Sequence, residues 1–242
     1  MTAPGDPYNA AGAGTATLEL LENARRYNAW LVDKLAPFLG EDNFELGAGH
    51  GTLTAVVANT RNVVASEPSA AGREVLSRRF AGNHRVRSVV AGLDQLDGSE
   101  RFDAVYSANV LEHVSDDFAL IAGSANVLKP GGYFTAIVPA GGWLYSPFDA
   151  AVGHHRRYGY ADRVRLTSLI KSARVPLELV TYRPFNPVGA LGWFFRMRLL
   201  QRDAIPAADI ERVDKLVPIL RLVDHVPFGF GQNLLLSFIK CR

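Results

Sequence analysis

The chain of 242 residues contains almost no cysteine and no long apolar run. Its one cysteine, Cys241, stands next to the last residue, so the chain has neither an internal disulfide nor a zinc site built on cysteines. A reducing, cytoplasmic environment is the expectation for such a sequence. No stretch of about 18 apolar residues is present, so we expect no membrane-spanning segment.

An excess of charge of one sign is also missing. Lys and Arg number 26 and Asp and Glu number 24, so the net charge is +2. A field this weak does not favour a groove that follows nucleic-acid phosphates. Apolar residues make up 48% and charged residues 21%, as in ordinary globular proteins. We therefore expect one domain at residues 15–242, behind a flexible arm at residues 1–14 without signal-peptide features.

Short apolar strands alternate with helices over the first 140 residues. Several strands are apolar throughout, which is typical of a parallel sheet covered on both faces. The pattern predicts an α/β, Rossmann-like, doubly wound fold. Strands are expected at residues 43–46, 62–66, 86–90, 102–107 and 133–138, and helices at residues 15–38, 52–59, 69–80 and 116–128, the last closed by Lys129-Pro130-Gly131-Gly132.

The regular alternation ends after Val138. A loop rich in Gly, Pro and aromatic residues spans residues 140–160, followed by an expected helix at 161–174. Two further strands are expected at 177–183 and 234–240. The long connection between them, residues 184–231, is the lid segment, with expected helices at 188–200 and 207–223. Connections of this length are commonly functional.

The strongest local signal is a glycine loop after the first strand, FELGAGHG. Glycines at 47, 49 and 51 let a ligand approach the backbone at the start of a helix. A dinucleotide fingerprint would need glycine at Thr52, so the loop fits NAD less well. Glu67 ends the second strand, where a carboxylate can accept both ribose hydroxyls of a nucleoside. The alternatives are a plain strand-to-helix turn and a solvated acid.

Four motifs, FELGAGHG, NVVASEPS, FDAVYSANVLEHV and LKPGG, follow one another between residues 43 and 138. In this order and spacing they resemble the class I S-adenosylmethionine-dependent methyltransferases. The resemblance implies a seven-stranded sheet whose last strand is antiparallel, a lid, S-adenosylmethionine as cofactor, and methyl transfer to a small molecule.

The same resemblance assigns cofactor contacts by position. The amino-acid moiety would lie against Glu45, the ribose against Glu67, and Glu112 and His113 would be structural, starting the next helix. Gly92 stands where many relatives carry an acid that contacts the adenine, so Leu93, Asp94 or a backbone group would substitute. The remaining implied contacts are Gly47, Ala48, Gly49 and Gly51 at the amino-acid moiety, Pro68 and Ser69 at the adenine, and Asn109 and Leu111 near the methyl group.

The second half resembles a bacterial subgroup of these enzymes whose substrates are poorly defined. The resemblance is carried by GHHRRY at 153–158, NPVGALGWFFRMRLL at 186–200 and GQN at 231–233. His154 occupies the histidine position of this motif. We predict that it is a base near neutral pH or a group that orients the acceptor, with His155 and Tyr158 as further catalytic candidates. The alternative is that His154 anchors the loop by hydrogen bonds.

Acceptor contacts are expected from the same loop. Arg156 and Arg157 suit a carboxylate or phosphate on the acceptor. The alternatives are a solvated basic turn or a salt bridge to Asp149. Tyr145 is a further expected contact with the acceptor. Six aromatic residues are candidates for an apolar acceptor pocket: Trp143, Phe148, Phe185, Trp193, Phe194 and Phe195.

The aromatic run at residues 193–195 leaves two further alternatives. Three consecutive aromatic residues cannot all face one way on a helix, and Arg196 and Arg198 follow them. A peripheral contact with a membrane surface therefore stays open, as does ordinary core packing.

Three other functions remain as alternatives. A nucleic-acid amino-methyltransferase would carry prolines after the fourth strand, where this chain reads Ser107-Ala108-Asn109-Val110. An NAD-dependent oxidoreductase is disfavoured by Thr52. A non-catalytic module that keeps the cofactor fold is disfavoured by the intact glycine loop and Glu67. No metal site is predicted, and the sequence assigns neither the acceptor nor the oligomeric state.

Overall fold

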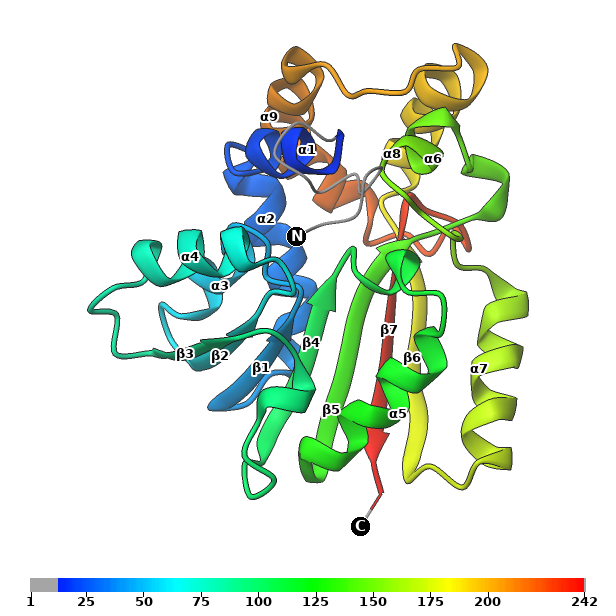
Figure 1. The fold of residues 1–242 in the computed structure, drawn as a ribbon. Coiled ribbons are helices and arrows are strands. Elements are labelled where there is room, and N and C mark those ends of the chain that lie inside the picture. The colour runs from blue at the N-terminus through cyan, green and yellow to red at the C-terminus, as the bar shows by residue number, and fades with distance from the viewer. Residues whose placement is uncertain (1–12, 242) are drawn as a thin grey trace.

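The computed structural model describes residues 13–241, which form a seven-stranded sheet with helices on both faces (Figure 1). The strand order is β3-β2-β1-β4-β5-β7-β6. Neighbours from β3 to β5 are parallel, whereas β7 lies antiparallel between β5 and β6. This confirms the predicted fold. The strands are β1 (Asp42–Leu46), β2 (Asn62–Ser66), β3 (Val86–Val90), β4 (Phe102–Ala108), β5 (Leu128–Pro139), β6 (Leu177–Phe185) and β7 (Asn233–Lys240).

Two hydrophobic cores lie on the two faces of the sheet. Residues of β2 alternate between them, since Val64 belongs to one core and Val63 and Ala65 to the other. The first core packs under α5 (Asp117–Val127) and α7 (Tyr160–Ser172). The second packs under α2 (Arg25–Leu35), α3 (Thr52–Val57) and α4 (Ala70–Arg79). Covering both faces explains why the strands read as nearly all apolar.

The prediction of a single helix at residues 15–38 is wrong. The chain forms α1 (Ala13–Leu21), α2 and a short turn η1 (Ala36–Phe38). The buried amide of Asn28 donates a 2.8 Å hydrogen bond to the Leu21 carbonyl, which holds the break between α1 and α2. Residues 1–12 of the predicted arm lie outside the described part of the chain, and residues 13–14 begin α1.

The helix predicted at residues 116–128 ends close to the expected position, but residues 129–132, expected to close it, belong to a strand. The helix ends at Val127, and β5 begins directly at Leu128, so the Lys-Pro-Gly-Gly segment is the first part of a long strand. Phe102 pairs with Leu128 in β5, so the strand contact with β4 begins before the segment.

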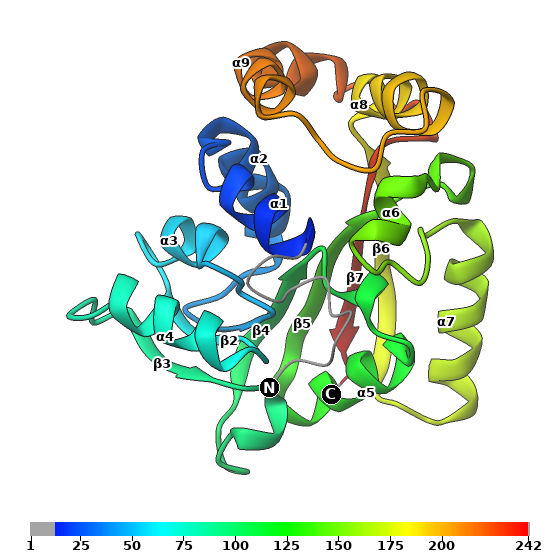
Figure 2. The same cartoon turned by 45° about the horizontal axis from the view of Figure 1, so that its top comes forward.

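The remaining helices gather beyond the carboxyl ends of the parallel strands (Figure 2). They are α6 (Pro147–Ala151), α8 (Pro187–Trp193), a π-helical turn η5 (Phe194–Leu199) and α9 (Ala207–Val223), which confirms both predicted lid helices. The lid segment is anchored to α2, because Lys34 pairs with Asp224 and the Tyr27 N–H donates to Asp214 at 2.9 Å. Among residues 13–241, none of the helices has the length and apolar character needed to cross a bilayer.

Candidate active site

The glycine loop joins β1 to α3 at the carboxyl edge of the sheet. Its glycines have φ values of +61° at Gly47, +54° at Gly49 and +80° at Gly51. Only glycine adopts this region without strain. The buried Ala48 donates its N–H to the Ser66 carbonyl at 2.7 Å, which ties the loop to the end of β2. The loop therefore presents backbone groups at the position that the sequence predicts for a cofactor.

The Glu67 carboxylate lies between this loop and the start of α4. Its Oε2 accepts the Gly49 N–H at 3.0 Å, and its Oε1 accepts the Ser69 N–H at 3.0 Å. Ser69 also caps α4 by accepting the Gly72 N–H at 3.3 Å. Pro68, between them, is exposed. The structure thus brings together the predicted ribose residue, the glycine loop and the predicted adenine residues.

An acidic group also lies beside Gly92, where the sequence lacks the acid expected at the adenine. Gly92 precedes the short turn η2 (Leu93–Gln95) after β3. A Cβ placed on Gly92 would lie 2.9 Å from an oxygen of Asp94. Leu93 is half-buried and packs against the first core. Of the proposed substitutes, Asp94 is therefore the one that supplies a carboxylate at this position.

Glu45 is buried, with an exposed fraction of 4%. Its Oε2 accepts the Thr54 hydroxyl at 2.6 Å and the Tyr106 hydroxyl at 2.9 Å, which links β1 to α3 and β4. Burial raises the pKa of Glu45 to about 7, against the effect of these two hydrogen bonds. Its predicted contact with the amino-acid moiety stays a prediction.

Asn109 and Leu111 follow β4 but lie in different environments. Asn109 is exposed, with a φ of +55°, and its N–H donates to the Ile137 carbonyl at 2.9 Å. Leu111 opens the turn η3 (Leu111–His113) and is fully buried in the first core. Asn109 is therefore placed to meet a ligand, whereas the position of Leu111 assigns it to packing.

A buried charge cluster centres on Asp149, in α6. Its Oδ1 contacts His154 Nδ1 at 2.7 Å and accepts the Arg157 Nε–H at 2.8 Å. Its Oδ2 accepts the backbone N–H and the hydroxyl of Ser146. Burial alone would raise the pKa of Asp149, but the His154 hydrogen bond and the Arg157 charge hold it below its ordinary value. Tyr145 donates its hydroxyl to the His154 carbonyl at 2.7 Å.

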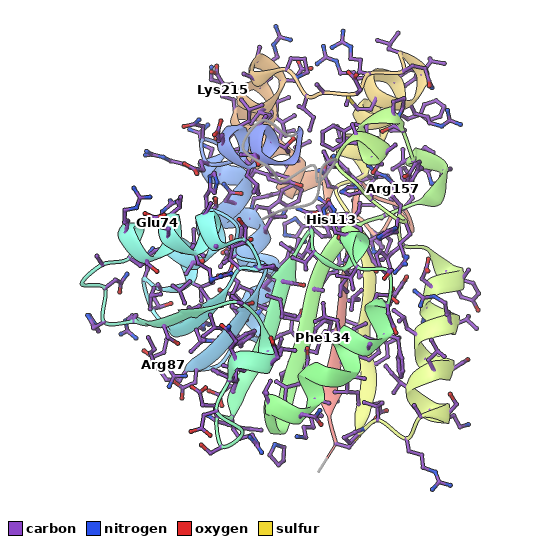
Figure 3. The ribbon with its side chains drawn as sticks, in the orientation of Figure 1. Glu74, Arg87, His113, Phe134, Arg157 and Lys215 are labelled. Atoms are coloured by element: carbon purple, nitrogen blue, oxygen red, sulfur yellow. The ribbon has the colours of Figure 1, made fainter. Side chains whose placement is uncertain are left out.

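Two residues that the sequence treats as structural complete this cluster. Glu112 is fully buried, and its Oε1 lies 3.8 Å from His154 Nε2. The rings of His113 and His154 meet edge to face, with centroids 4.6 Å apart. Figure 3 shows His113 and Arg157 close to the carboxyl ends of β4 and β5. The prediction that Glu112 and His113 start the next helix is wrong, since α5 begins at Asp117.

Burial governs the ionisation of both residues. It raises the pKa of Glu112 to about 8, with the Arg157 charge acting in the opposite direction. Burial, with the neighbouring His154 acting in the same direction, lowers the pKa of His113 to about 3. The sequence offered the Arg157–Asp149 pair as an alternative, but gave no signal that Glu112 and His113, about 40 residues earlier, join it.

The other residues of the GHHRRY motif anchor the loop. Tyr158 is fully buried and donates its hydroxyl to Asp117 at 2.8 Å, so its position assigns it to packing and corrects its predicted catalytic role. Arg156 pairs with Asp117 at 3.0 Å and donates to the carbonyls of residues 114–115. His155 is exposed. The salt-bridge alternative holds for Arg157, whose side chain is 2% exposed beside Asp149.

The aromatic residues expected to line an apolar pocket pack against one another instead. Trp193 stacks edge to face on Phe148, with centroids 5.2 Å apart, and covers the Arg157 guanidinium at 4.7 Å. Trp143 is 49% exposed and packs against Phe194. The lid segment and the loop after β5 thus share a small core, and acceptor contacts from these side chains stay a prediction.

Comparison with known proteins identifies the first part of this architecture. Residues 44–134 match a family model described as a methyltransferase domain. Over these residues the chain is therefore similar to a methyltransferase domain. It is 34% identical over 129 residues to a demethylmenaquinone methyltransferase of Clavibacter sepedonicus, covering 52% of this chain and 53% of that protein. It is 32% identical over 102 residues to a ubiquinone biosynthesis O-methyltransferase of Paramagnetospirillum magneticum, covering 41% of each.

Solved structures share the fold of this chain. A chain from the complex between the Haloferax volcanii Trm112 methyltransferase activator and a putative methyltransferase matches over the full length of both, with 16% identity and a TM-score of 0.64. A putative sarcosine dimethylglycine methyltransferase from Galdieria sulphuraria matches 89% of this chain and 86% of its own, with 16% identity and a TM-score of 0.57.

The matched regions place limits on what the relatives support. The chain spans about half the length, or less, of the curated relatives it matches. The family match includes the glycine loop, Glu67 and Asn109, whereas Asp149 and His154 lie beyond its end. Of the charge cluster, the family match includes Glu112 and His113, whereas the part around Asp149 rests on the structure alone.

Proposed function

We propose that this domain transfers a methyl group from S-adenosylmethionine to a small-molecule acceptor. The observation that carries the proposal is the Glu67 carboxylate at the end of β2, held by the Gly49 and Ser69 N–H groups beside three left-handed glycines. A carboxylate in this place suits a ribose diol, and a glycine backbone admits a close ligand. The residues present therefore fit a nucleoside cofactor with an amino-acid tail.

Each part of the cofactor would have its own contacts. Gly47, Gly49 and Gly51 would meet the amino-acid tail, Glu67 the ribose, and Asp94 the exocyclic amine of the adenine. Asn109, exposed at the end of β4, would lie next to the methyl group. The cofactor supplies an electrophilic methyl group on a sulfonium, and the protein must hold the acceptor nucleophile in line with it.

On the acceptor side, His154 is either a base or an orienting group. Asp149 contacts its Nδ1 and favours the tautomer in which Nδ1 carries the proton and Nε2 has a free lone pair. As a base, Nε2 would take the proton of an acceptor O–H or N–H while the oxygen or nitrogen bonds to the methyl carbon. As an orienting group, it would accept a hydrogen bond from the same atom.

Small molecules are the proposed class of acceptor for two reasons. Two curated relatives are named as a demethylmenaquinone methyltransferase and a ubiquinone biosynthesis O-methyltransferase, and quinones are small molecules. The net charge of +2 gives the protein little attraction for a polyphosphate chain.

The first test is a thermal melt of the full chain with S-adenosylhomocysteine or NAD. A ligand that binds only the folded state stabilises it by about 2.7 kcal/mol at 100 times its Kd. We expect the melting temperature to rise with S-adenosylhomocysteine and to stay unchanged with NAD. A folded sample that responds to NAD alone, or to neither compound, contradicts the proposal. Labelled S-adenosylmethionine and a panel of small acceptors would then identify the substrate.

A further inference from the structure

Three side chains in the charge cluster have the arrangement of metal ligands. One ligand atom each from Glu112, His113 and His154 lies within 4.8 Å of the other two. Glu112 and His113 belong to η3, after β4, whereas His154 follows α6. Two segments far apart in sequence therefore bring two imidazoles and one carboxylate to a single point.

The Glu112 carboxylate is an independent observation. It has an exposed fraction of 0%, and no other described residue donates a hydrogen bond to either of its oxygens. Buried polar groups almost always have partners, because an unpaired one is costly. The nearby guanidinium of Arg157 is directed to Asp149 and to the Ala140 carbonyl instead. The carboxylate thus lacks a partner that a cation would supply.

The outer contacts of both imidazoles also match those of metal ligands. A histidine that binds a metal usually directs its other ring nitrogen to a carboxylate or a backbone carbonyl. His154 directs Nδ1 to Asp149 at 2.7 Å, which leaves Nε2 on the side of Glu112. The ring of His113 has the Gly153 backbone as a hydrogen-bond partner. Both rings are therefore oriented by outer contacts.

We infer that Glu112, His113 and His154 bind one divalent transition-metal ion. Two imidazoles with one carboxylate suit Zn²⁺ or Fe²⁺, whereas Mg²⁺ and Ca²⁺ prefer sets of oxygen ligands. Metal–ligand bonds of about 2.0–2.2 Å place neighbouring ligand atoms of a tetrahedral site about 3.3–3.6 Å apart. The 3.8 Å between Glu112 Oε1 and His154 Nε2 needs only a small side-chain adjustment to reach this range.

Three protein ligands leave coordination positions free for water or for an oxygen of a bound molecule. When an acceptor oxygen takes such a position, His154 orients the acceptor through the ion and does not take its proton. Metal binding itself is independent of the proposed methyl transfer, so the two proposals can fail separately.

The test strips the full chain with a chelator, adds one equivalent of Zn²⁺ and measures the zinc retained after gel filtration. Titration with Co²⁺, whose visible spectrum reports tetrahedral or five-coordinate sites, provides a second measurement. We expect one ion per chain in the unaltered protein. We expect Glu112→Gln and His154→Gln to weaken zinc binding at least about 100-fold, since each removes a ligand and even an outer contact is worth 10–100-fold.

His155→Gln is the matched control, because it removes an exposed imidazole one position away from His154. It should bind zinc like the unaltered chain. Circular dichroism of each metal-free variant checks that it is folded. The inference is overturned if the folded, unaltered chain retains no zinc and gives no cobalt spectrum. It is also overturned if the Glu112 and His154 variants bind zinc as tightly as the control.

Discussion

The two halves of the candidate site are built by different means. At the ends of β1 and β2, the cofactor half presents backbone groups, with one half-buried carboxylate held by two N–H groups. At the ends of β4 and β5, the acceptor half is a cluster of buried ionisable side chains around Asp149. Changes in the glycine loop and at Glu67 should therefore affect ligand binding, whereas changes in the buried charge cluster should first affect stability.

The largest effect is expected from Asp149→Ala. The change leaves the guanidinium of Arg157, which is 2% exposed, without its counter-ion. Breaking a buried ion pair by removing one partner typically destabilises a protein by about 3–5 kcal/mol. Urea denaturation should show this loss in the free energy of unfolding.

The exposed Asp203 provides the control for this change, because Asp203→Ala should alter stability by less than about 0.5 kcal/mol. Equal stability of the two variants would show that the acceptor half is not held together by its charges, and the comparison of the two halves would fail.

The next largest effect is on the pH dependence of stability, and it comes from Glu45, a buried acid within the cofactor half. Its pKa is raised to about 7 in the folded chain, so between its ordinary value and pH 7 the folded state binds more protons than the unfolded state. The free energy of unfolding therefore falls as the pH rises through this window. Glu45→Gln should remove this fall, which is on the order of 3 kcal/mol for such a shift.

Urea denaturation of both proteins between pH 4 and pH 8 measures the effect. The free energy of unfolding of the Glu45→Gln variant should rise relative to that of the parent chain as the pH rises. The Glu178→Gln variant, changed at an exposed position of β6, should show the same pH dependence as the parent. If the free energies of unfolding of Glu45→Gln and the parent change in parallel with pH, the pKa of Glu45 is not raised in the folded chain.

A third and smaller effect is expected from Gly49→Arg. Gly49 has a φ of +54°, and a Cβ there would lie 3.2 Å from the Leu18 side chain of α1. An arginine would therefore fill the space over the loop and weaken binding of S-adenosylhomocysteine at least about 100-fold, or about 2.7 kcal/mol. Calorimetric titration measures this. Gly98→Arg, where nothing lies within 4 Å of a Cβ, should bind like the parent, and equal binding by Gly49→Arg would remove the loop from the site.

The same contrast explains how far the sequence predicts the molecule. The glycine loop and Glu67 were predictable because strand, turn and cap signals are local, and parallel strands end at one edge. The surroundings of Glu112 were not, since they include the loop around His154, about 40 residues later in the chain. Likewise, the break between α1 and α2 depends on a side-chain bond from Asn28, which helix periodicity does not reveal.

The smallest effect is expected from Glu67→Gln. An amide keeps one acceptor oxygen but turns an NH₂ group toward either the Gly49 or the Ser69 N–H, so one of the two bonds that position the side chain is lost. The ribose also loses a charged acceptor, and we expect S-adenosylhomocysteine to bind about 10-fold more weakly, which is about 1.4 kcal/mol. Methylthioadenosine, which has the ribose but no amino-acid tail, should lose the same factor. Glu74→Gln, on the exposed side of α4, is the control. If only the compound with the tail loses affinity, Glu67 contacts the tail and not the ribose, and the assignment of the cofactor half would have to be reversed.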